Sequence, residues 1–130
     1  MEGKSSPGPQ LGPSYRAIVE RLNDLGIFED PDFAREMLHE FMKDSADVIA
    51  KIGEAIAQGD AGACERLGHR VKGASLNLGA ERLGGLAFLI EQAGQEKDLT
   101  GIDAVHDVLS HEFDDVRAFL IRILESPAPR

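Results

Sequence analysis

Apolar residues recur every three or four positions along most of this 130-residue chain, and this periodicity constrains the fold more than any other feature. Such spacing places the apolar side chains on one face of an α-helix, whereas a half-buried strand alternates with a period of two. No segment shows strand-like alternation. Because aromatic residues make up only 5% of the chain and Trp is absent, aliphatic side chains must fill most of the core. The sequence therefore predicts an all-α fold.

Glycine, proline and aspartate residues divide the periodic pattern into five expected helices. The first ends before Gly26, and the second begins with Asp30 as N-cap and Pro31 as its first helical residue. The third lies between Asp60, its N-cap, and Gly79, which tolerates the left-handed conformation found just past a helix end. The expected ranges are about 15–25, 31–58, 61–78, 80–97 and 101–126.

The connections between these helices are only a few residues long, so neighbouring helices must pack antiparallel. The expected architecture is an up-down antiparallel four-helix bundle, with a short additional N-terminal helix. Residues 14–126 would form this single domain. Residues 1–13, rich in Gly, Pro and Ser, would form a flexible N-terminal tail, and residues 127–130 a short C-terminal one.

The net charge limits the partners that the chain can bind, and its cysteine content indicates the compartment in which it works. The chain has 14 Lys and Arg against 23 Asp and Glu, a net charge of -9, which opposes binding to nucleic acid or to anionic membranes. Its one cysteine, Cys64, cannot form an intrachain disulfide and is expected in the core of a cytoplasmic protein. No apolar run of about 18 residues is present to span a membrane. A monomer is expected, because one apolar face per helix leaves no second face for dimerisation.

One histidine lies away from the apolar face of the third helix. His69 is two residues from both Leu67 and Val71, which is about 200° around the helix, so its imidazole should face solvent. The apolar positions of this helix are Cys64, Leu67, Val71, Ala74 and Leu78. The neighbours of His69 on its own face are Glu65, Lys72, Gly73 and Leu76.

Gly73 is costly at this place, because a mid-helix glycine costs about 1 kcal/mol relative to alanine and an exposed position offers no packing gain. Close approach of another molecule to His69 would explain it, although Gly73 alone could also serve tight packing with the N-terminal helix. Lys72, one turn from His69, could hold an anion carried by the imidazole. An exposed histidine or lysine alone is ordinary, but together these residues favour a phosphohistidine.

The segment HRVKGAS at 69–75, followed by LGA at 78–80, resembles the signature of histidine-containing phosphotransfer (HPt) domains, which act in multistep two-component phosphorelays. That signature is a histidine, a lysine three residues on, a glycine next, two small residues, and then an apolar residue followed by Gly-Ala. The helical pattern from about residue 30 to 125 is also similar to the bundle of this family.

The resemblance implies that His69 accepts a phosphoryl group from the aspartate of one response-regulator receiver domain and passes it to the aspartate of another. A hybrid histidine kinase would be a further partner. The chain would be a carrier, not an enzyme, and no phosphate-binding loop or kinase motif contradicts this. It would bind no cofactor, because Mg²⁺ would belong to the receiver. Lys72 would steady the phosphoryl oxygens, and Gly73 would leave space for the receiver.

Two further groups of residues follow from the resemblance. The expected docking surface comprises Leu76, Glu65, Ile27 and Phe28. Many family members also place a polar side chain of the following helix near the histidine. An antiparallel turn at Gly79 brings Ile90, Glu91 and Gln92 level with His69, with Gln95 one turn further. Gln92 is the preferred candidate; if Glu91 points there instead, its charge would oppose the phosphoryl group and shorten the lifetime of the phosphohistidine.

The alternative function is a helical adaptor that binds a receiver through the same surface without being phosphorylated. No metal site is expected. Glu65 and His69 have i, i+4 spacing, but no third ligand is evident, and Glu65 is expected to pair with His69, Arg66 or Arg70. His106 and His111 are five residues apart, about 140° around a helix, and so do not form a metal-binding pair.

Overall fold

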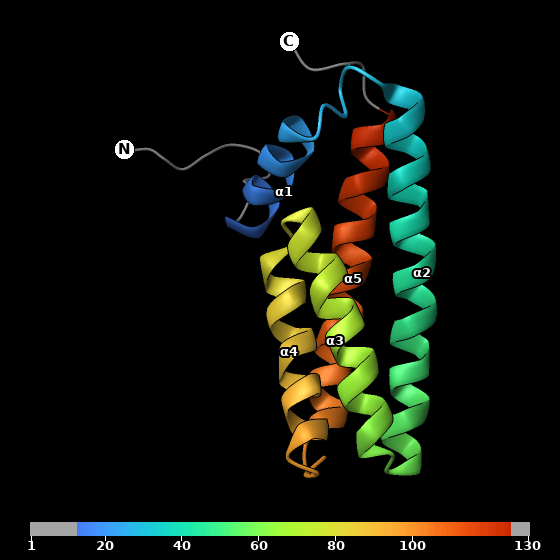
Figure 1. Ribbon diagram of the computed structural model, residues 1–130, viewed down its shortest axis with the longest axis vertical. Coiled ribbons are helices and arrows are strands. Elements are labelled where there is room, and N and C mark those ends of the chain that lie inside the picture. The colour runs from blue at the N-terminus through green and yellow to red at the C-terminus, as the bar shows by residue number, and fades with distance from the viewer. Residues whose placement is uncertain (1–12, 126–130) are drawn as a thin grey trace.

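The computed structural model describes residues 13–125, and within this range the secondary structure consists of helices alone. The elements are α1 (Pro13–Asp24), α2 (Pro31–Gln58), α3 (Ala61–Leu78), α4 (Glu81–Gln95) and α5 (Ile102–Glu125). Helices α2 to α5 run side by side along the long axis, and α1 lies near one end of the bundle (Figure 1). The predicted all-α bundle with an additional N-terminal helix is confirmed. Apart from Pro13, which begins α1, the expected tails lie outside the described residues.

The helix ends follow from the capping residues that the sequence predicts. The side chain of Asp30 accepts a hydrogen bond from the backbone N–H of Phe33 at 3.1 Å, and Asp60 accepts one from Ala63 at the same distance. Gly79 ends α3 in the left-handed conformation, with φ of 90°. These caps satisfy backbone groups that the helices leave unpaired and fix the short turns that make the neighbouring helices antiparallel.

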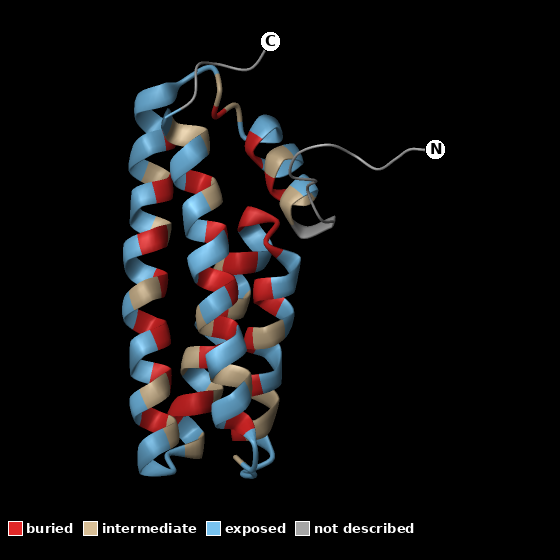
Figure 2. Ribbon diagram, turned by 180° about the vertical axis from the view of Figure 1, so that it is seen from behind, coloured by how far each residue is buried: buried red, intermediate tan, exposed pale blue. Residues whose placement is uncertain are grey.

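The core runs the length of the bundle and continues under α1 (Figure 2). Ile18 and Leu22 of α1 are fully buried, so the additional helix closes one end of the core. A Cβ at Gly79 would lie 2.7 Å from the carbonyl oxygen of Ala17, which shows how closely α1 packs on the turn between α3 and α4. The largest fully buried side chains of α2 to α5 are Leu38, Ile52, Leu83, Ile90, Leu109 and Leu120.

Helices α3 and α4 approach each other most closely, through glycines. A Cβ at Gly68 would lie 2.8 Å from the backbone nitrogen of Glu91 and 3.0 Å from the carbonyl oxygen of Ala87. A Cβ at Gly94 would lie 2.5 Å from the carbonyl oxygen of Ala61. Real side chains essentially never come this close to backbone atoms, so these glycines set the distance between the two helices.

This close contact corrects the predicted buried face of α3. Cys64, Val71 and Leu78 are buried as predicted, but Leu67 and Ala74 are only partly buried. The positions that α4 covers in their place are Gly68 and Ser75. The face is shifted by one residue because the closest approach is made by a residue without a side chain, which apolar periodicity does not detect.

His106 has a structural place between α5 and α2. Its Nε2–H donates to the carbonyl oxygen of Ile49 at 2.8 Å, and the ring lies over Gly53, where a Cβ would be 3.0 Å from Cε1. His111 bonds within its own helix, through Nδ1 to the carbonyl oxygen of Asp107 at 2.8 Å. The two histidines therefore bond to carbonyl groups of different helices.

Candidate functional site

His69 lies on the exposed side of α3, as the helical spacing predicts, and 66% of its side chain is accessible to solvent. Its Nδ1 is 3.0 Å from Oε2 of Glu91 on α4. The other oxygen of the same carboxylate, Oε1, is 2.8 Å from Nζ of Lys72. One carboxylate from α4 therefore joins the histidine and the lysine of α3.

Glu91, and not Gln92, is thus the α4 residue that meets His69, and the preference for Gln92 was wrong. The close approach at Gly68 is the physical reason, because the backbone of Glu91 lies directly against that glycine. Successive residues of a helix differ by about 100°, so a helix that turns residue 91 toward α3 turns residue 92 away from it. Gln92 is half-buried in this arrangement.

The charge state of Glu91 follows from its partners. Hydrogen bonding from Lys72 lowers the pKa of the Glu91 carboxyl, and hydrogen bonding from His69 adds to this, against the raising effect of burial. The group is therefore ionised at neutral pH and can only accept hydrogen bonds. A neutral imidazole facing it must carry its proton on Nδ1, which leaves the lone pair of Nε2 free. Glu91 in this way selects one tautomer of His69.

Lys72 lies against α4. Only 24% of its side chain is exposed, and its ammonium nitrogen is 5.1 Å from the centre of the Phe88 ring in addition to its ion pair with Glu91. Sequence reasoning missed Phe88. Its position three residues before Glu91 places both on one face of α4, so the i, i+3 spacing would have found it once Glu91 was chosen.

Gly73 is exposed, and a Cβ added to it would meet nothing within 4 Å. It therefore does not serve packing against α1, which was the structural explanation considered for it. Leu76, one turn further, is 47% exposed and touches α4 at Gly84, where a Cβ would lie 2.8 Å from its Cδ2. Phe88 is 42% exposed. The surface beside His69 is consequently open at Gly73 and apolar at Leu76 and Phe88.

The other residues expected at the docking surface are placed differently. Ile27 is only 2% exposed and belongs to the core, so it is not available to a partner. The reason is the turn after α1: Gly26 has φ of 71°, and the N–H of Ile27 bonds to the carbonyl oxygen of Leu22 at 3.1 Å. This geometry folds an apolar residue just past a helix back onto that helix. Phe28 is partly buried against the core.

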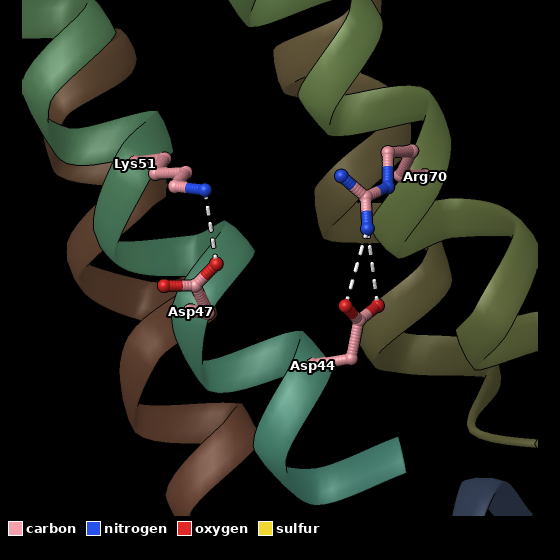
Figure 3. A network of polar contacts seen from close by, with 4 residues as sticks. All are labelled: Asp44, Asp47, Lys51 and Arg70. Carbon is pink, nitrogen blue, oxygen red and sulfur yellow. Dashed lines mark hydrogen bonds and ion pairs between the residues drawn. The ribbon is translucent and has the colours of Figure 1, made fainter. Parts of the chain in front are cut away.

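Glu65 is half-buried, and its backbone packs against Gly94 of α4. Two of its three expected partners are engaged elsewhere, since His69 bonds to Glu91 and Arg70 bonds to Asp44 of α2. Arg70 donates from Nη2 to both carboxylate oxygens of Asp44, at 3.2 and 3.3 Å (Figure 3). Figure 3 also shows the ion pair between Lys51 and Asp47 of α2, at 3.1 Å. Both pairs are exposed and contribute little to stability.

Within residues 13–125, no group of three or more His, Cys, Asp or Glu side chains is arranged to hold a metal ion. In the same part of the chain, no helix has both the length and the apolar character that a membrane span requires.

The candidate site consists of four side chains and one glycine, namely His69, Lys72, Glu91, Phe88 and Gly73. It offers an exposed nucleophilic nitrogen, an adjacent cation and an open approach.

A family model described as Hpt domain matches residues 36–119 of the chain. The match covers more than half of the chain, begins in α2, ends in α5 and includes all of α3 and α4. Neither a search of curated proteins nor a search of solved structures found a match.

Proposed function

The chain belongs to the Hpt domain family, and on this premise we propose that it carries a phosphoryl group on His69 between the aspartates of response-regulator receiver domains. Membership implies a role in phosphotransfer within two-component phosphorelays, because Hpt domains are phosphocarriers without kinase activity. The observation that supports His69 as the carrier is its geometry: an exposed imidazole whose Nδ1 is held by Glu91, which leaves Nε2 free to react.

In the proposed step, the Nε2 lone pair of His69 attacks the phosphorus of an acyl phosphate on a receiver aspartate. A P–N bond forms as the P–O bond breaks, and the aspartate leaves as a carboxylate. Nδ1 keeps its proton, so the phosphorylated ring is positively charged, next to the carboxylate of Glu91. In the second step, the carboxylate of another receiver attacks phosphorus, and His69 leaves as the neutral imidazole. Neither step transfers a proton.

Partner contact would use the surface beside His69. Gly73 gives the active site of a receiver room to approach, and Leu76 and Phe88 provide apolar contacts around it. The chain would supply the nucleophile and its electrostatic surroundings, while Mg²⁺ and the groups that activate the acyl phosphate would belong to the receiver. A hybrid histidine kinase would be the original source of the phosphoryl group. We place this role in the cytoplasm, the reducing compartment that the lone thiol of Cys64 favours.

The test is phosphoryl transfer from a phosphorylated receiver domain to the wild-type protein, to His69→Gln and to His111→Gln. The last variant is a matched control, because His111 is an exposed histidine whose Nδ1 bonds to a carbonyl group of its own helix, α5. We expect an acid-labile, base-stable phosphate on the wild type and on His111→Gln, and none on His69→Gln. Absence of transfer from several receivers that nevertheless bind would overturn the carrier function and favour the adaptor. Transfer to His69→Gln would place the phosphate on another residue.

A further inference from the structure

The carboxylate of Glu91 is shared by two groups that the proposed function uses separately. Its Oε2 accepts from Nδ1 of His69 at 3.0 Å, and its Oε1 pairs with Nζ of Lys72 at 2.8 Å. Only 16% of the Glu91 side chain is exposed. Ion pairs and hydrogen bonds shielded from water in this way are stronger than those of fully exposed groups. A change in the charge of this one residue should therefore affect the histidine and the lysine together.

The contacts of Lys72 draw its ammonium group toward α4. Both of its partners, Glu91 and the Phe88 ring, belong to α4. The phosphoryl group would be on Nε2, on the side of the His69 ring remote from the nitrogen that Glu91 holds. For its ammonium to bind phosphoryl oxygens, Lys72 must share or leave the carboxylate. Glu91 and the phosphoryl group therefore compete for the same cation.

Besides competing for Lys72, the Glu91 carboxylate favours loss of the phosphoryl group by keeping the imidazole ring protonated. A phosphohistidine whose ring is protonated on Nδ1 is the better phosphoryl donor, because the imidazole then leaves as a neutral molecule. A negative carboxylate bonded to Nδ1–H holds that proton in place. The added phosphoryl group also carries about −1.5 to −2 charges, which Glu91 repels.

From these contacts we propose that Glu91 is a positioning residue that makes His69 a high-potential, short-lived phosphoryl carrier. It keeps Nδ1 protonated throughout the cycle and withholds Lys72 from the phosphoryl group. The inference rests on the proposed function, since it concerns the lifetime of a phosphohistidine at the same site. Its consequence is that the protein passes phosphoryl groups on rapidly and does not store them.

Replacement of Glu91 by an amide separates its charge from its hydrogen bond. The amide oxygen of Glu91→Gln can still accept from Nδ1–H, while the pull on Lys72 is lost. We expect the phosphohistidine of this variant to live roughly tenfold longer, because the negative charge that holds the proton on Nδ1 and competes for Lys72 is removed. The transfer equilibrium with a receiver should shift toward the phosphorylated carrier by a similar factor. Glu54→Gln, an exposed carboxylate of α2 outside the site and the docking surface, is the control and should change neither quantity more than about twofold.

The experiment measures phosphohistidine half-life and transfer equilibrium, together with the ¹⁵N spectrum of the His69 ring before phosphorylation. The Nδ1–H tautomer should persist in Glu91→Gln and be mixed with the other tautomer in Glu91→Ala. A purely structural role for Glu91 would not produce this pattern. Lys72→Met provides a second measurement: it should shorten the lifetime more in the Glu91→Gln background than in the wild type.

The possible outcomes separate the two proposals. If neither the wild type nor any variant accepts a phosphoryl group, the proposed function fails. If all accept it and the half-life of Glu91→Gln equals or falls below that of the wild type, the proposed function stands and the inference about Glu91 is overturned. Additive effects of Lys72→Met and Glu91→Gln would also overturn it, because they would show that the two groups do not compete.

Discussion

Gly68 and Gly73 lie five residues apart in α3, and their surroundings are opposite. Gly68 is buried, and a Cβ there would meet backbone atoms of α4 within 3 Å. Gly73 is exposed, and a Cβ there would meet nothing within 4 Å. Five residues correspond to about 140° around the helix, so the two glycines mark two different sides of α3. The same residue type serves close helix packing on one side and an open surface on the other.

The contrast separates the side of α3 that stabilises helix packing from the side that presents the reactive histidine. The buried side of α3 fixes the position of α4, and the open side presents His69. Glu91 connects the two, because its backbone lies against Gly68 while its side chain reaches the imidazole. The geometry of the exposed histidine therefore depends on a buried glycine contact, and substitutions on the two sides of α3 should have different consequences.

The largest expected effect on stability comes from Gly68→Ala. The added methyl group would meet the nitrogen of Glu91 and the carbonyl oxygen of Ala87, and neither backbone atom can move without shifting α4. Overpacking of this kind costs about 1–3 kcal/mol, which equals or exceeds the gain of about 1 kcal/mol in helix propensity. We expect a lower urea midpoint and loss of the contact between His69 and Glu91. A variant as stable as the wild type, with that contact intact, would show that α3 and α4 are not held together by this glycine.

Gly73→Gln should have an effect of opposite sign on stability. The side chain enters open space, and replacing a mid-helix glycine adds up to about 1 kcal/mol of helix propensity. Phosphoryl transfer should nevertheless be lost, because the side chain occupies the approach to His69. Denaturation and transfer assays on Gly73→Ala provide the control, since a single methyl group should preserve most of the transfer. Normal transfer by Gly73→Gln would mean that receivers approach from another direction.

The smallest expected effect is the contribution of the Glu91 charge to the pH dependence of the free energy of unfolding. Hydrogen bonding from Lys72 and from His69 lowers the pKa of this carboxyl below its ordinary value of 4.5. Its ionised form therefore stabilises the folded state above pH 4.5, and this contribution disappears as the pH falls through the lowered pKa. Glu91→Gln should be less stable than the wild type at pH 7, and the difference should narrow in acid. Urea denaturation at several pH values tests this, and a constant difference would indicate that the charge of Glu91 is not involved.

Much of the fold could be predicted because it depends on local chemistry. Asp30, Asp60 and Gly79 cap helices through bonds to residues only a few positions away, so their roles can be inferred from the sequence. The exposure of His69 follows from its angular distance to the apolar residues of its own helix. Such inferences require only the geometry of a single helix.

The remaining features depend on how two helices meet, which periodicity does not specify. Gly68 appears in sequence as a helix-weakening residue, yet it is the point where α4 comes closest to α3. The antiparallel turn at Gly79 predicts which three residues of α4 lie level with His69. Which of them faces His69 depends on how α4 is rotated about its own axis, and this rotation selects Glu91 over Gln92. The resemblance to HPt domains implies a surface position for Ile27, whereas the turn at Gly26 folds this residue into the core.

The central claim is that His69 reacts through Nε2 while Glu91 holds Nδ1. It is tested most directly by ¹H–¹⁵N and ³¹P spectra of the His69 ring, recorded before and after incubation with a phosphorylated receiver domain. We predict a proton on Nδ1 in both states and phosphorus coupling to Nε2 after incubation. Phosphorus on Nδ1, or a His69 ring that stays unchanged while the receiver is dephosphorylated, would contradict the account.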